Sequence, residues 1–308
     1  MKTRHDLWQA RTADDFAART LALGIDLKEM IATLSNAPQD TALMVVGSVA
    51  EGLANLESDV DLLLLVDSDE TLRKSTQADW SFSTGEVYKP ATVKFFPKGV
   101  ELDIEVCVLD RASTLKATTD TLMKFMSAPD SADGIPKLQT QEQRFLHQLR
   151  KSWVVANNHV AERWRRDLNV SHLPIYSMVT NYIDYMELLE DVVSALRKND
   201  LLDVANVGRV CAEYGSQSLL GLGDETNPSR KWLAHLLTDL GRGKPELKPL
   251  TDAALGLLFP APNMSEASGA LYVQNLRAFG LQLKKIMDGN VSLHRMFDML
   301  FSKLHYIM

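Results

Sequence analysis

The chain has 308 residues, with 40 acidic and 33 basic side chains and a formal net charge of −7. Its 45% hydrophobic and 24% charged residues are average for a soluble globular protein, which excludes disordered, collagen-like and coiled-coil classes. No apolar run reaches the roughly 18 residues that span a membrane, and two cysteines make no disulfide scaffold. We therefore expect a cytoplasmic protein of two domains, without a secretory signal, membrane contact or extended nucleic-acid binding.

The first third of the chain predicts one helix followed by four strands. Apolar residues recur at helical spacing over residues 12–35, and Thr12 is placed to cap this helix. Strand-length apolar runs follow at residues 42–46 and 60–66, with further strand candidates at 87–96 and 100–109. This order lacks the regular strand–helix alternation of a doubly wound fold, so we expect an α+β domain with a mixed or antiparallel sheet.

The rest of the chain reads as helical. Three-to-four spacing of apolar residues predicts helices at residues 139–168, 173–198, 201–220, 228–240 and 265–288. Residues 127–136 carry Pro, Ser, Asp and Gly in the pattern of a linker. We therefore predict a small α+β domain over residues 1–130 and a helical bundle domain over 137–308, which would form the other wall of a cleft.

One segment, residues 47–62, combines features that suit phosphate and metal chemistry. Gly47 and Ser48 follow a predicted strand directly, and a glycine there lets backbone N–H groups approach a phosphate closely. Asp59 and Asp61 stand at the start of the next strand, where alternation places both on one side about 7 Å apart. Two convergent carboxylates beside a phosphate cradle suit Mg²⁺, which prefers hard oxygen ligands together with substrate phosphate.

The strand predicted at 100–109 offers a third carboxylate. Its polar face carries Glu101, Asp103 and Glu105. Clustered carboxylates repel one another and raise one another's pKa unless a cation neutralises them, so such a cluster predicts a metal ion.

The pattern G-S-x3-G-x5-S-D-h-D, where h is apolar, followed by h-D-h on a later strand, resembles the nucleotidyltransferase superfamily typified by DNA polymerase β. The spacing is similar to that of the minimal bacterial and aminoglycoside nucleotidyltransferases, and the resemblance covers about residues 42–109. It implies two Mg²⁺ ions and a nucleoside triphosphate, for which we expect ATP. It also implies transfer of a nucleoside monophosphate to an acceptor hydroxyl.

The resemblance also assigns roles to particular residues. Gly47, Ser48 and Ser58 would hold the triphosphate, and Asp59 and Asp61 would ligate both metal ions. The third ligand, at the acceptor oxygen, would be Asp103.

Two positions leave alternatives open. Both Asp103 and Glu105 are flanked by apolar residues, and we prefer Asp103 because its shorter side chain suits the tight octahedral geometry of Mg²⁺. Glu101 and Glu105 are then expected on a solvated strand face. Glu51 departs from the family pattern, since relatives often have a basic or polar residue there, and it adds negative charge beside the phosphate site.

In the helical part, Lys231 and Trp232 open a predicted helix. The resemblance implies that Lys231 reaches the triphosphate, while the alternative is a capped surface helix with a buried Trp.

The leading hypothesis for function is an Mg²⁺-dependent nucleotidyltransferase that acts on the hydroxyl of a small molecule. A protein-modifying nucleotidyltransferase and a second-messenger synthase are alternative enzymes. A catalytically inert nucleotide-binding or antitoxin-like module is the alternative outside enzymes.

Overall fold

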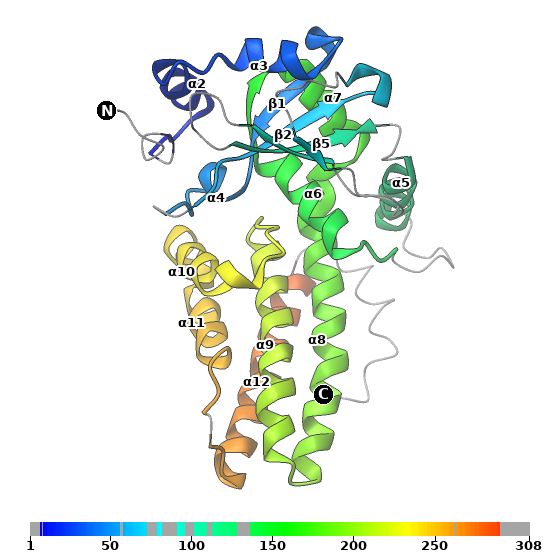
Figure 1. Ribbon diagram of the computed structural model, residues 1–308. Coiled ribbons are helices and arrows are strands. Elements are labelled where there is room, and N and C mark those ends of the chain that lie inside the picture. Colours follow the sequence, from blue (N-terminus) through cyan, green and yellow to red (C-terminus); the bar gives the residue numbers. More distant parts are fainter. Residues whose placement is uncertain are drawn as a thin grey trace. The chain divides into compact units, whose positions relative to one another are not determined.

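A computed structural model describes residues 7, 9–55, 58–72, 79–81, 91–95, 102–109, 113–127, 136–261 and 263–289. It divides the chain into two compact units (Figure 1). The first unit comprises Met1–Thr121 and Lys137–Ser171, and the second comprises Leu122–Pro136 and His172–Met308. The polypeptide therefore passes between the units more than once.

The first unit is built on a mixed six-stranded sheet with the order β3-β4-β5-β2-β1-β6. Its strands are β1 (Ala42–Val45), β2 (Asp61–Val66), β3 (Asp79–Ser81), β4 (Ala91–Phe95), β5 (Leu102–Val108) and β6 (Trp153–Ala156). Strands β2 and β5 run parallel, and every other neighbouring pair is antiparallel. The predicted α+β class with a mixed sheet is confirmed.

Strand alternation gives the sheet two different faces. Leu62, Leu64 and Val66 of β2 join Ile104 and Val106 of β5 in one buried core. Helices α2 (Ala13–Ala22) and α3 (Leu27–Leu34) close this core from that side (Figure 1). The alternate residues of β2 and β5, which include the carboxylates of both strands, therefore lie on the opposite face of the sheet.

The single helix predicted over residues 12–35 is two helices. Thr12 caps the first, as predicted, by accepting a hydrogen bond from the backbone of Asp15 at 3.2 Å. Gly24 then adopts a φ of +79°, which ends that helix, and the Asp26 side chain caps the second. The apolar periodicity continues across the break because both helices bury their apolar sides against the same core.

The largest difference from the sequence prediction lies at residues 137–171. These were assigned to a helical domain, but they group with the sheet and form α6 (Thr140–Lys151), β6 and α7 (Asn158–Asp167). Strand β6 pairs with β1, with Val154 opposite Met44 and Trp153 opposite Val45. The short apolar run at Trp153 fits a strand, and Asn157, at a φ of +54°, separates it from α7. Most of the predicted linker, residues 128–135, lies outside the described residues.

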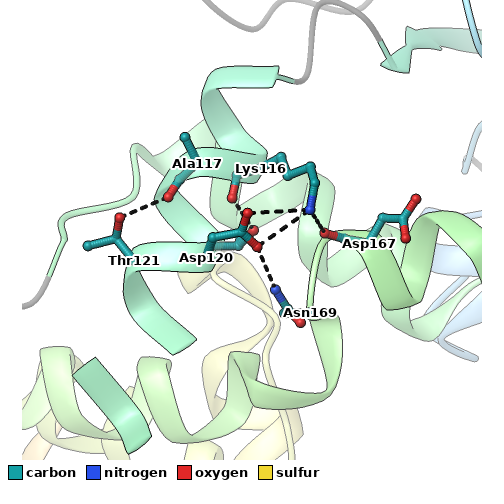
Figure 2. Close-up of polar contacts among 7 residues, drawn as sticks. Lys116, Ala117, Asp120, Thr121, Asp167 and Asn169 are labelled. Atoms are coloured by element: carbon teal, nitrogen blue, oxygen red, sulfur yellow. Dashed lines mark hydrogen bonds and ion pairs between the residues drawn. The ribbon is translucent and has the colours of Figure 1, made fainter. Parts of the chain in front are cut away.

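Helix α5 (Ser113–Ser127) is tied to the chain that follows α7 (Figure 2). The Lys116 ammonium contacts the Asp120 carboxylate and the carbonyl of Asp167, each at 3.3 Å. The Asn169 amide donates to the same carboxylate at 3.3 Å. Because Asp167 is the last residue of α7, Lys116 satisfies one of the carbonyls that a helix end leaves open.

The described part of the second unit is helical, as predicted. It contains α8 (Leu173–Arg197), α9 (Leu201–Leu222), α10 (Leu233–Gly243), α11 (Lys248–Leu257) and α12 (Glu266–Asp288), which share one apolar core. Tyr182 donates to the carbonyl of Gly280 at 3.2 Å, and Tyr185 donates to that of Leu276, which fastens α8 to α12. Across the described ranges, no helix combines the length and apolar character needed to cross a membrane.

Candidate active site

The turn after β1 and the start of β2 are in direct contact. Gly47 has a φ of +66°, and a Cβ atom built on it would lie 2.5 Å from Oδ2 of Asp61. Both facts require glycine, because any side chain would be strained and would displace the carboxylate. The N–H of Val46 donates to the carbonyl of Asp61 at 3.0 Å, which holds the two segments together. Ser48 follows in the short helix α4 (Gly47–Ala50).

The strand register brings two predicted ligands side by side. Asp61 on β2 stands directly opposite Asp103 on the parallel strand β5. The N–H of Asp103 donates to the carbonyl of Val60 at 3.1 Å, which fixes this register at the strand starts. Neighbouring strands lie about 4.8 Å apart, so both carboxylates share one edge of one sheet face. Asp59 precedes β2 instead of lying within it.

The electrostatics of this edge are dominated by crowded negative charge. Burial raises the pKa of Asp61 to about 6, and the charges of Glu105, Asp103 and Asp59 raise it as well. Arg144 acts in the opposite direction. The carboxylates that the sequence singled out are therefore close enough to influence Asp61, and a cation would relieve their repulsion.

The structure distinguishes the two candidates for the third ligand. Asp103 is in register with Asp61, whereas Glu105 stands opposite Leu63 and forms an ion pair with Arg144 at 3.0 Å. Glu105 was expected to be solvated, but its side chain is only 21% exposed, and its charge influences Asp61 more than that of Asp103 does. The register with Asp61 sets Asp103 apart from Glu105, and Asp103 as the third ligand stays a prediction. Glu101 lies outside the described residues.

The donor set fits a metal that is held partly by its substrate. Among the residues that the structure describes, no group of three or more His, Cys, Asp or Glu side chains is arranged to hold a metal ion by itself. Mg²⁺ usually takes one or two carboxylates, with substrate phosphates and waters completing its octahedron. Asp61 supplies an oxygen donor of that kind beside the turn at Gly47, and Asp103 stands opposite it on β5.

The remaining predicted residues have other surroundings. The hydroxyl of Ser58 accepts from the backbone of Asn55 at 2.9 Å and donates to its side chain at 3.2 Å, so Ser58 shapes the turn before Asp59. Lys231 belongs to the second unit, where its ammonium lies 4.7 Å from the centre of the Trp232 ring. A contact of either residue with a triphosphate stays a prediction.

The sequence reasoning missed two residues of helix α6. Arg144 contacts Glu105, and His147 Nε2 lies 3.3 Å from a carboxylate oxygen of Glu51, at the end of α4. His147 and Glu51 are 3% and 12% exposed, so Glu51 is turned into the protein instead of being presented freely beside the turn. The spacing of Arg144 and His147 places both on one side of a helix, but nothing in the sequence indicated that this helix covers the sheet.

Comparison with known proteins bears on the segment that contains these residues. Residues 27–116 match the family model of the nucleotidyltransferase domain. This range includes the turn at Gly47 and the three aspartates, and it confirms the resemblance found in the sequence. Residues 27–116 therefore carry a nucleotidyltransferase domain, a class of domain whose general chemistry is the transfer of a nucleoside monophosphate. Helix α6 lies beyond the matched range.

The comparisons with curated proteins and with solved structures add no argument about function. No curated protein matches the chain significantly. Among solved structures, a nucleotidyltransferase-like protein from Exiguobacterium sibiricum 255-15 is 9% identical, with a TM-score of 0.43. The alignment covers 89% of this chain and 77% of that one.

Proposed function

We propose that the protein is an Mg²⁺-dependent enzyme that transfers a nucleoside monophosphate from a nucleoside triphosphate to a hydroxyl of a small molecule. The observation that carries this proposal is the register of β2 and β5, which sets Asp61 beside Asp103 on one sheet face. The contact of Asp61 with Gly47 adds a turn on which a phosphate can lie next to these carboxylates. ATP is the proposed triphosphate.

Each of the residues would have a defined task. Asp59 and Asp61 would hold two Mg²⁺ ions, and Asp103 would hold the one at the acceptor oxygen. Gly47 and Ser48 would support the triphosphate, with Lys231 as a further contact. When bound, Mg²⁺ would neutralise the triphosphate and favour the deprotonated acceptor hydroxyl. The acceptor oxygen would bond to the α-phosphorus as the bond to pyrophosphate breaks.

The charge of the site supports this assignment. Burial and, after it, the three neighbouring carboxylates make it unfavourable to keep Asp61 ionised, and both raise its pKa. Such an arrangement is typical of a site whose full charge balance is reached only with its ligands. The two cysteines are buried and unbridged, which suits a reducing compartment, and we propose that the enzyme acts in the cytoplasm.

The proposal is tested by incubating the protein with Mg²⁺, each of four α-labelled triphosphates and a panel of hydroxyl-bearing acceptors. Mass spectrometry should detect an acceptor enlarged by one nucleoside monophosphate, together with released pyrophosphate. The product should be missing in EDTA and with Asp59→Asn, and present with Asp40→Asn, a control at an exposed aspartate. Product formation that survives both EDTA and Asp59→Asn would overturn the metal assignment.

A further inference from the structure

Arg144 is an exposed cation beside the carboxylates of the candidate site. Its Nη2 donates to Oε1 of Glu105 at 3.0 Å, and its side chain is 58% exposed. A guanidinium has five N–H donors in a planar fork, and an ion pair dedicated to one carboxylate is commonly bidentate. The pair with Glu105 shows a single hydrogen bond within the described part of the chain, so most donors of Arg144 are left for another acceptor.

Glu105 places this guanidinium on the face of the sheet that carries the aspartates. It lies two residues after Asp103 on β5, and two residues of a strand point to the same face. The ion pair with Glu105 therefore holds Arg144 on the same sheet face as Asp61 and Asp103.

Helix α6 is fixed at a second point of the same site. His147 follows Arg144 by three residues on this helix and contacts Glu51, which ends the short helix after Gly47. The helix start is fixed as well, because Glu142 accepts from the backbone of Gln139 at 2.7 Å in a capping box. A side chain on a helix held at these points has a defined position relative to both the turn and β5.

We propose, resting on the function proposed above, that Arg144 binds the phosphates of the nucleotide and that Glu105 positions it. The charges of the site call for such a cation. Asp59, Asp61, Asp103 and Glu105 face a triphosphate that brings further negative charge, and two divalent ions do not balance this total. A guanidinium matches the geometry of phosphate oxygens better than an ammonium does.

The competing explanation is that Arg144 only neutralises Glu105. A double-mutant cycle separates the two, because each predicts a different effect of removing Glu105 when Arg144 is already gone. The measurement is the Kd of α,β-methylene-ATP with Mg²⁺, determined by calorimetry, so it needs no acceptor and no turnover. The variants are Arg144→Gln, Arg144→Lys, Glu105→Gln and the double Glu105→Gln/Arg144→Gln, with Arg166→Gln as a control at an exposed arginine of α7. Thermal melting checks that each variant is folded.

Loss of one charge-assisted hydrogen bond to phosphate should weaken binding about 10- to 100-fold in Arg144→Gln. Arg144→Lys should be intermediate, Glu105→Gln should weaken binding less, and Arg166→Gln should match the wild type. The double variant should stay as weak as Arg144→Gln. Should Arg144→Gln not fold, the Lys variant decides, and wild-type affinity there overturns the proposal.

Three other results would overturn it. Recovery of wild-type affinity in the double variant would show that Arg144 only neutralises Glu105. Equal affinities of Arg144→Gln and Arg166→Gln would show that the contact does not exist, and abolished binding in Glu105→Gln would make Glu105 a metal ligand. Absence of binding by the wild type would instead overturn the proposed function itself, so the two failures are distinguishable.

Discussion

Gly47 and Asp61 approach so closely that a methyl group on the glycine would lie 2.5 Å from the carboxylate. The turn predicted to hold phosphate and the aspartate predicted to hold metal are therefore parts of one packed unit. A change in the turn is transmitted to the carboxylate, which makes the glycine testable without touching any ionisable group.

We predict that Gly47→Ala abolishes transfer, because the new methyl group displaces Asp61 and the positive φ strains the backbone. Gly52→Ala is the matched control: its φ is +72°, but nothing lies within 4 Å of the added Cβ. Both variants should lose roughly 1 kcal/mol of unfolding free energy from backbone strain, measured by urea denaturation. Only Gly47→Ala should lose activity, and normal turnover by that variant would contradict the close approach.

We predict that Asp61→Asn stabilises the metal-free protein while lowering transfer at least ~10³-fold. Asp61 binds its proton more tightly in the folded chain, so ionising it destabilises the fold as pH rises from 3.8 through about 6. The Asn variant lacks this cost, which amounts to up to roughly 3 kcal/mol.

The measurement is the free energy of unfolding of both proteins in EDTA between pH 4 and pH 8. Their difference should be small at the acid end and grow toward pH 8. Asp40→Asn, at an exposed position, should show no such trend. If the difference in unfolding free energy between Asp61→Asn and the wild type does not change with pH, burial does not disfavour the charge of Asp61. In the transfer assay, Asp59→Asn should lose activity as well.

We predict that Asp103→Asn loses transfer and that Glu105→Gln retains most of it. The reason is the register, which pairs Asp103 with Asp61. Steady-state transfer rates of the two variants, measured with one acceptor and one triphosphate, decide whether Asp103 or Glu105 is the third ligand. The reverse result would move the metal site two residues along β5, and full activity of both variants would remove the third carboxylate from the mechanism.

We predict that Mg²⁺ and triphosphate together raise the melting temperature by a few degrees. A ligand that binds only the folded state at 100 times its Kd stabilises it by about 2.7 kcal/mol. For a chain of this length that corresponds to a shift of this size. The shift should vanish in EDTA or with Asp59→Asn and should be smaller with Ser48→Ala. A shift that persists without Mg²⁺ would favour a nucleotide-binding module over an enzyme.

The sequence predicted those parts of the site whose neighbours are close along the chain. Gly47, Asp59 and Asp61 lie within one turn-and-strand segment, so their spacing alone indicated the chemistry. Helix boundaries in the second unit were also readable, as at Ser265, which caps α12.

What the sequence could not give were partners far apart along the chain. Periodicity identifies an apolar run at Trp153 but not that it pairs with β1, more than a hundred residues earlier. For the same reason the pairs Arg144–Glu105 and His147–Glu51 were not foreseen. An amphipathic helix shows that one side is buried, without showing against what.

The late position of β6 in the sequence affects when the sheet of the first unit can be completed during synthesis. Its partner β1 is synthesised early, but the edge of β1 stays open until residue 156 has emerged from the ribosome, after part of the second unit has already been translated. A gene fragment ending near residue 130 would leave that edge exposed and would be prone to aggregate. Because the first unit resumes at Lys137, no single cut in the coding sequence yields both units as intact proteins.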